Sequence, residues 1–141
     1  MLLILDSNEY LFALGAERDK TCEKLIEVIA KESDVVFIRI PRFVVMEVRN
    51  NLTPEAFKEF ILLISKLTFI DEDLVVPYEL VGEYEYKGLK PADAFIAAYA
   101  EYTGADALVT ENRHFLSRQS DLPFKVLTAE NCLKLIKSSP R

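Results

Sequence analysis

Five short apolar runs recur along the chain, and segments with helical spacing separate them. Runs of about four residues without polar alternation are typical of strands that are buried on both faces of a sheet. Strands that alternate with helices indicate a parallel sheet covered by helices on both sides. The apolar runs are 2–5, 35–38, 67–70, 107–110 and 124–127, and the segments with helical spacing are 8–14, 21–31, 43–52, 54–66, 77–86, 91–102 and 129–137.

This pattern predicts an α/β fold, a three-layer α/β/α sandwich with a central parallel sheet. Because crossovers between parallel strands are right-handed, few strand orders remain, and we favour the order 3-2-1-4-5. We expect one domain over residues 1–141, with residues 138–141 frayed. Pro54 and Pro91 stand at the first positions of two helices, and Gly104 stands where the 91–102 helix should end.

The composition is that of an ordinary globular protein, with 50% hydrophobic and 28% charged residues. The 17 basic and 23 acidic residues give a net charge of −6, which argues against binding to nucleic acid through overall charge. A local basic patch that acts together with a metal ion remains compatible with this balance. The spacing of Cys22 and Cys132 fits neither a metal site nor a redox motif, so we expect free thiols in a reducing compartment. No signal peptide or membrane span is predicted, and we expect a cytoplasmic protein with no membrane partner.

Candidate chemistry begins where the first strand ends, at Asp6. In open α/β sheets ligands bind at the carboxyl ends of the strands, at the point where the strand order reverses. The predicted order places the segment from Thr110 to Asn112 beside Asp6 at that point. Capping of the next helix is an alternative role for Asp6.

Two further acids are candidates for the same crevice. Asp93 lies in the first turn of a markedly apolar helix, where the helix dipole alone could also explain an aspartate. Glu47 follows an apolar run on another helix, where a buried glutamate would need a partner or a function.

Taken together, these segments resemble the PIN domain, the metal-dependent ribonuclease fold of many VapC-type toxins and RNA-processing nucleases. In PIN domains an apolar strand ends in Asp, then Ser or Thr, then Asn; a helical glutamate follows a hydrophobic run; and an apolar helix carries an aspartate in its first turn. The matching segments are Leu5-Asp6-Ser7-Asn8, Val44-Val45-Met46-Glu47-Val48, Lys90-Pro91-Ala92-Asp93-Ala94-Phe95-Ile96-Ala97, Leu108-Val109-Thr110-Glu111-Asn112-Arg113-His114-Phe115 and Lys125-Val126-Leu127-Thr128.

The resemblance implies an endoribonuclease that uses Mg²⁺ or Mn²⁺, since hard cations prefer oxygen ligands. It also implies a cognate antitoxin and a homodimer as possible assemblies, for which tyrosines 78, 84 and 86 would suit an interface. Many members have an aspartate where this chain has Asn112, which leaves open whether Asn112 or Glu111 completes the site. The implied metal ligands are Asp6, Glu47 and Asp93; Asn112 is a fourth catalytic candidate; Ser7, Asn8 and Thr110 would orient the ligands.

Several basic residues lie near the proposed crevice in sequence and could contact RNA phosphates. Scattered surface charge is an equally good explanation for any one of them. Asp71, Glu72 and Asp73 form an acidic turn that we interpret as a solvated loop. The main RNA-contact candidates are Arg42, Lys90, Arg113 and His114, and Arg39, Arg49 and Lys87 are weaker ones.

Two other functional classes fit parts of the pattern. A haloacid-dehalogenase-like phosphatase also begins with a strand that ends in aspartate, but it needs a second aspartate two residues later, where this chain has Asn8. A PIN-fold module without catalysis, serving as a scaffold or as an RNA- or protein-binding module, stays open because Asn112 brings no charge.

Overall fold

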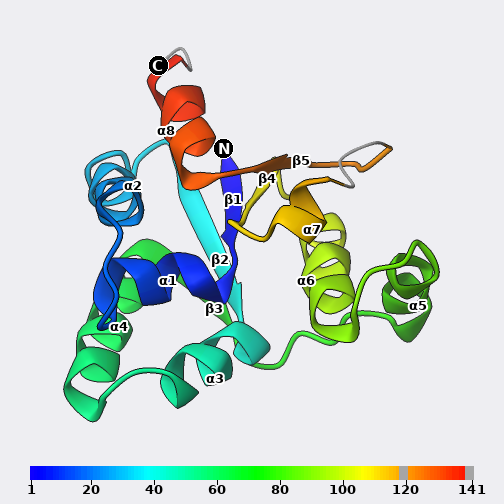
Figure 1. The fold of residues 1–141 in the computed structure, drawn as a ribbon, viewed down its shortest axis with the longest axis horizontal. Coiled ribbons are helices and arrows are strands. Elements are labelled where there is room, and N and C mark those ends of the chain that lie inside the picture. The colour runs from blue at the N-terminus through cyan, green and yellow to red at the C-terminus, as the bar shows by residue number, and fades with distance from the viewer. Residues whose placement is uncertain (118–120, 139–141) are drawn as a thin grey trace.

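A computed structural model describes residues 1–117 and 121–138, so the predicted fraying of residues 139–141 lies outside the described residues. Figure 1 shows a central sheet with helices on both sides. All strand pairs are parallel and the strand order is β3-β2-β1-β4-β5, which confirms the predicted fold class and order. The strands are β1 (Leu2–Leu5), β2 (Phe37–Pro41), β3 (Thr68–Asp71), β4 (Ala107–Val109) and β5 (Lys125–Leu127).

The helices form two layers. Helices α1, α2, α4 and α8 pack on one another on one side of the sheet, while α5 and α6 pack together on the other (Figure 1). Helix α3 follows β2 and contacts α1. Their bounds are α1 (Ser7–Leu14), α2 (Lys20–Lys31), α3 (Arg42–Asn50), α4 (Pro54–Leu67), α5 (Tyr78–Tyr86), α6 (Pro91–Tyr102), α7 (Arg113–Leu116) and α8 (Ala129–Ser138). No helix in the described part of the chain is long and apolar enough to cross a membrane.

Strand β1 is the centre of the core. Leu3, Ile4 and Leu5 are at most 1% exposed, because β2 pairs with one edge of the strand and β4 with the other while helices cover both faces. Full burial of each such side chain contributes roughly 1.5–3 kcal/mol. The strand therefore has one stable register, and this register fixes where the chain leaves the sheet at Asp6.

Strand β2 begins two residues later than the apolar run predicts. The amides of Val35 and Val36 both donate to the carbonyl of Glu32, at 2.9 and 2.8 Å, and so close the turn after α2. These two valines cannot also join the ladder through the same amides. The strand instead runs from Phe37 to Pro41, and Pro41 is its last residue.

Helix α6 matches its predicted bounds, whereas the short helix α7 is a feature that periodicity missed. Pro91 opens α6, and Gly104 follows its end with a φ of 73°, a conformation that favours glycine. Four residues are too few for a hydrophobic period to show. The signal available for α7 was Asn112, whose side chain caps the helix by accepting from the amide of His114.

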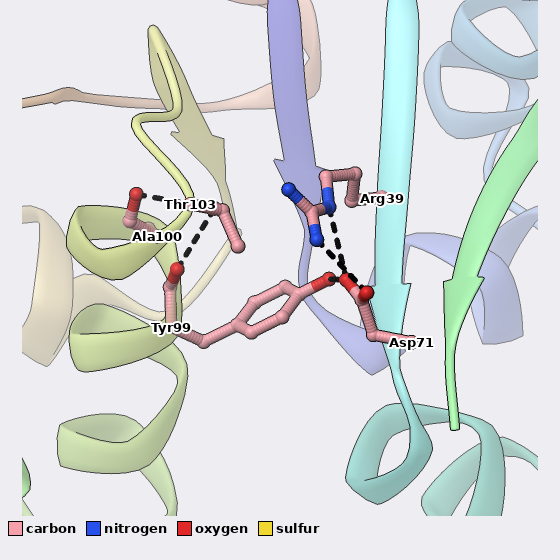
Figure 2. Close-up of polar contacts among 5 residues, drawn as sticks. All are labelled: Arg39, Asp71, Tyr99, Ala100 and Thr103. Carbon is pink, nitrogen blue, oxygen red and sulfur yellow. Dashed lines mark hydrogen bonds and ion pairs between the residues drawn. The ribbon is translucent and has the colours of Figure 1, made fainter. Parts of the chain in front are cut away.

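A polar network joins the two halves of the sandwich, as Figure 2 shows. Arg39 on β2 donates to both carboxylate oxygens of Asp71 on β3, each at 2.9 Å, and the hydroxyl of Tyr99 on α6 donates to Asp71 Oδ2. Asp71 is 8% exposed, so the expectation that it belongs to a solvated loop is wrong. Arg39 is likewise not a free phosphate-binding residue, because its guanidinium is held by Asp71 and stacks over Phe69.

We predict that Tyr99→Phe lowers the free energy of unfolding by about 1.5–3 kcal/mol, since it removes a buried hydrogen bond to a charged group. Urea unfolding of both proteins measures this change. Tyr102→Phe on the same helix is the matched control, because Tyr102 is 51% exposed, and its effect should stay within about 0.5 kcal/mol. Equal stability of Tyr99→Phe and the parent would show that the network does not hold α6 on the sheet.

Candidate functional site

Asp6 lies at the carboxyl end of β1 and has defined partners for both carboxylate oxygens. Oδ1 accepts from the amide of Ser7 at 2.7 Å and Oδ2 accepts from the hydroxyl of Thr110 at 3.0 Å. The amide of Asp6 itself donates to the carbonyl of Val109 at 2.9 Å, which joins the ends of β1 and β4. Asp6 therefore caps α1, as the alternative expected, and also stands at the reversal point of the sheet.

Asp93 and Asn112 meet from α6 and from the loop after β4. Asn112 Nδ2 donates to Asp93 Oδ2 at 3.3 Å, while Asn112 Oδ1 accepts from the amide of His114 at 3.0 Å. The amide of Asn112 in turn donates to the hydroxyl of Thr110 at 3.1 Å. Because its carbonyl oxygen caps α7, Asn112 turns an NH₂ group toward Asp93, which suits the orientation of a carboxylate better than ligation of a cation.

Glu47 approaches the same place from α3, where its side chain is half-buried. Burial raises the pKa of Glu47; a hydrogen bond with the Ser7 hydroxyl opposes the rise, and the charges of Asp6 and Asp93 add to it. Burial also raises the pKa of Asp6, against the hydrogen bonds from Thr110 and Ser7, and the charge of Asp93 again adds. The three carboxylates thus lie close enough to repel one another, although they come from the end of β1, from the middle of α3 and from the first turn of α6.

The chemistry of these donors fits a hard divalent cation. Three carboxylates that repel one another gain stability when a cation lies between them. Their oxygens do not all lie within 4.8 Å of one another, since the one group that meets this limit among the described residues is Glu9, Cys22 and Glu111. An open arrangement suits Mg²⁺, which keeps several waters and binds through few carboxylates.

Glu111 contributes to a different cluster from the three predicted ligands. Its Oε1 accepts from the amide of Ala129 at 2.8 Å, at the start of α8. The side chain is half-buried. Glu9 and Cys22, which sequence reasoning passed over as site residues, lie beside it. The available signal was Glu9 itself, an acid within the otherwise apolar face of α1.

The basic candidates lie at the rim. Arg42 is the first residue of α3, the helix that carries Glu47. Lys90 directly precedes α6, the helix that carries Asp93. Arg113 and His114 open α7. These four side chains and Asn8 are exposed.

The largest hollow described is away from the carboxylates. It measures about 710 Å³ and lies between α6 and β5, where Gly104, Asp106 and Lys125 line it. These residues stand at the amino ends of β4 and β5, at the opposite edge of the sheet from Asp6.

The fold and this arrangement of acids define a PIN-type α/β protein. The chain belongs to the PIN domain family, whose model matches residues 3–120. No curated protein matches the chain significantly.

Two solved structures share the fold. A chain in the crystal structure of VapBC2 from Rickettsia felis bound to a DNA fragment from its promoter is 22% identical, with a TM-score of 0.63 over 90% of this chain and 97% of that one. A chain in the crystal structure of FitAcB from Neisseria gonorrhoeae is 15% identical, with a TM-score of 0.62 over 91% of this chain and 98% of that one. At these identities the likeness establishes the fold.

We predict that Asn112→Asp destabilises the metal-free protein at neutral pH and tightens Mn²⁺ binding. The variant replaces a donor 3.3 Å from Asp93 Oδ2 with a second carboxylate, and repulsion raises the pKa values of the pair. Stability that depends on raised carboxyl pKa values is present below the unfolded value, 3.8 for aspartate, and is lost as the pH rises through the folded values. The difference in melting temperature from the parent should therefore vanish at acid pH.

Calorimetric titration with Mn²⁺ and metal-free melting measure the two halves of this prediction. Asn131→Asp, an exposed change on α8, is the control and should alter neither. Unchanged Mn²⁺ affinity together with unchanged melting would place Asn112 outside the site.

Proposed function

We propose that this protein is a metal-dependent endoribonuclease that hydrolyses RNA phosphodiester bonds. PIN domain proteins are generally nucleases, and the observation that carries the proposal is the convergence of Asp6, Glu47 and Asp93 at the carboxyl edge of the sheet. Selection for stability alone would not gather them, since two carboxylates about 5 Å apart repel by roughly 3 kcal/mol at an effective dielectric near 20.

In the proposed reaction Asp6, Glu47 and Asp93 hold Mg²⁺ or Mn²⁺ through carboxylate oxygens. The bound ion would lower the pKa of a water and neutralise charge that develops on the scissile phosphate. The Ser7 amide and the Thr110 hydroxyl fix the orientation of Asp6, so its carboxylate needs little rearrangement to bind. Asn112 does the same for Asp93 through its NH₂ group.

RNA would be held by the exposed basic residues at the rim of the crevice. With a net charge of −6, only a local patch can attract a phosphate backbone. Arg42 and Lys90 flank the helices that carry Glu47 and Asp93, and Arg113 and His114 follow Asn112 directly.

The biological role we propose is the toxin of a toxin–antitoxin pair. The support is the resemblance to VapC-type toxins together with the shared fold of the chain in the VapBC2 structure. A small antitoxin gene beside the gene for this protein, whose product copurifies with the chain, would support the pair; a protein that expresses alone without toxicity and finds no such partner would contradict it.

We also propose a homodimer. Tyr78 and Tyr86 are 92% and 94% exposed and suit an interface, whereas Tyr84, expected with them, is buried and donates to Glu101 at 2.8 Å. Light scattering that gives the monomer mass of 16.1 kDa at micromolar concentration would contradict the dimer.

A non-catalytic binding module is the second candidate. The donor role of Asn112 favours it, because the site then lacks the fourth charge that many PIN domains have. The cleavage experiment below separates the two candidates.

We predict that Asp93→Asn reduces Mn²⁺-dependent cleavage of RNA at least about 100-fold. A metal ion supplies several kcal/mol to the transition state, and each 1.36 kcal/mol is a factor of ten in rate. The asparagine keeps the shape of the side chain and can still accept from Asn112, so the fold should stay intact. Cleavage of a labelled RNA, followed with and without EDTA, measures the change.

Glu59→Gln on α4 is the matched control, because Glu59 is exposed, and it should cleave like the parent. Cleavage by Asp93→Asn at the parental rate would refute the role of Asp93. Absence of cleavage by the parent on any RNA, with Mn²⁺ bound, would favour the binding module.

A further inference from the structure

A second acidic cluster lies on the α1 side of the sheet and is separate from the proposed nuclease ligands. A carboxylate oxygen of Glu9, the Sγ of Cys22 and a carboxylate oxygen of Glu111 all lie within 4.8 Å of one another. They come from α1, from α2 and from the loop after β4. Three separate segments therefore bring a ligand atom each to one largely buried point.

Two of the three residues are buried, Glu111 is half-buried, and one oxygen of the cluster is unpaired. Glu9 is 1% exposed and Cys22 is 2% exposed. The thiol of Cys22 donates to Glu9 Oε2 at 3.1 Å, while Glu9 Oε1 is buried with no hydrogen-bond partner. A buried acceptor without a partner is unfavourable, and it is more unfavourable when it is charged. This oxygen belongs to the carboxylate that faces Glu111, so it points to a missing positive group.

That positive group is either a proton or a metal cation. Two carboxylates have only acceptor atoms, so Glu9 and Glu111 cannot bind each other unless one carries a proton. Burial raises the pKa of Glu9 to about 8, against the hydrogen bond from Cys22 and with the charge of Glu111, so the metal-free protein holds that proton at neutral pH. With a shared proton the Cys22 thiol contacts Glu9 alone, through its hydrogen bond to Oε2, whereas a cation would bind all three groups.

The kinds of donor atom and the distances between them indicate which cation would bind. Thiolate and carboxylate ligands together suit Zn²⁺, whose bonds of about 2.3 Å to sulfur and 2.0–2.2 Å to oxygen put tetrahedral ligands roughly 3.3–3.7 Å apart. Cys22 Sγ and Glu9 Oε2 are 3.1 Å apart, and the three ligand atoms lie within 4.8 Å of one another, so small side-chain shifts would bring them to these distances. Mg²⁺ and Mn²⁺ prefer oxygen ligands alone.

We propose that Glu9, Cys22 and Glu111 form a structural Zn²⁺ site, distinct from the nuclease ligands. On binding, the thiol of Cys22 and the carboxyl of Glu9 would each release a proton to solvent, and one thiolate and two carboxylates with three negative charges in all would surround the ion. The amide of Ala129, which donates to Glu111 Oε1, orients that ligand and leaves Oε2 for the metal.

The consequence of this site is a link between α1, α2 and the loop that carries Thr110 and Asn112. An ion that binds only the folded chain stabilises it by mass action. The site does not depend on the proposed ribonuclease activity, and its test reads out metal binding rather than cleavage.

The test uses Co²⁺ as a spectroscopic substitute for Zn²⁺. Metal-free protein titrated with Co²⁺ should develop a near-ultraviolet band for thiolate-to-cobalt charge transfer, and Zn²⁺ but not Mg²⁺ should displace it. A thiolate band cannot arise from Asp6, Glu47 and Asp93, which contain no sulfur. Zn²⁺ should also raise the melting temperature of the parent and release protons to a weak buffer.

Cys22→Ser should abolish the band, and Glu9→Gln should weaken Zn²⁺ binding by more than the roughly 10–100-fold that loss of an orienting partner costs. Cys132→Ser is the matched control, since Cys132 is also a buried free thiol but is not one of the three ligands, and it should keep the band. Circular dichroism confirms that each variant is folded.

An absent band in the folded parent would overturn the proposal and leave Glu9 and Glu111 as a pair that shares a proton. A band that survives in Cys22→Ser, or one that disappears in Cys132→Ser alone, would overturn the assignment of Cys22.

Discussion

The structure depends on one constraint, the complete burial of β1 between two parallel neighbours. Leu3, Ile4 and Leu5 are fully buried because β2 and β4 pair with the two edges of β1 while helices cover both faces, and the strand order reverses beside β1. Asp6, the first polar residue after the strand, then lies at the point where the strand order reverses. Its two oxygens are held there by Ser7 and Thr110, so the geometry of the candidate site follows from the core rather than from the loops.

The position of Asp93 depends on a second interaction, far from the crevice. Tyr99 lies on the same helix and donates to Asp71, which is also bound by Arg39, so α6 is held to β2 and β3 on the far side of β1 (Figure 2). Burial alone would raise the pKa of Asp71, but the hydrogen bonds from Arg39 and Tyr99 lower it below the ordinary value. A carboxyl with a lowered pKa contributes stability that is present above its unfolded pKa and is lost as the pH falls through the folded value. This anchor of α6 therefore persists at neutral pH and weakens in strong acid.

Elements with a local signal in the sequence were predicted correctly. Interactions between side chains that are distant in sequence were not predicted. The sheet order, the bounds of α6 and the position of Asp6 follow from apolar runs, Pro91 and Gly104. The pairing of Arg39 with Asp71 requires the register of β2 against β3, in which Arg39 faces Phe69 and Pro41 faces Asp71, and no local pattern contains that register. The roles of the site residues remain predictions, and the structure adds that Asn112 donates to Asp93.

The segment from Thr110 to Asn112 explains how one small chain can hold two acidic clusters side by side. Successive residues of extended backbone point in opposite directions, so Thr110 and Asn112 reach Asp6 and Asp93 while Glu111 reaches Glu9 and the amide of Ala129. A cation held by Glu111 would fix the backbone on either side of it, and with it the NH₂ group that orients Asp93. In the proposed assignment, oxygen ligands alone at one cluster and a sulfur ligand at the other would favour different cations, so the two sites would not compete for the same ion.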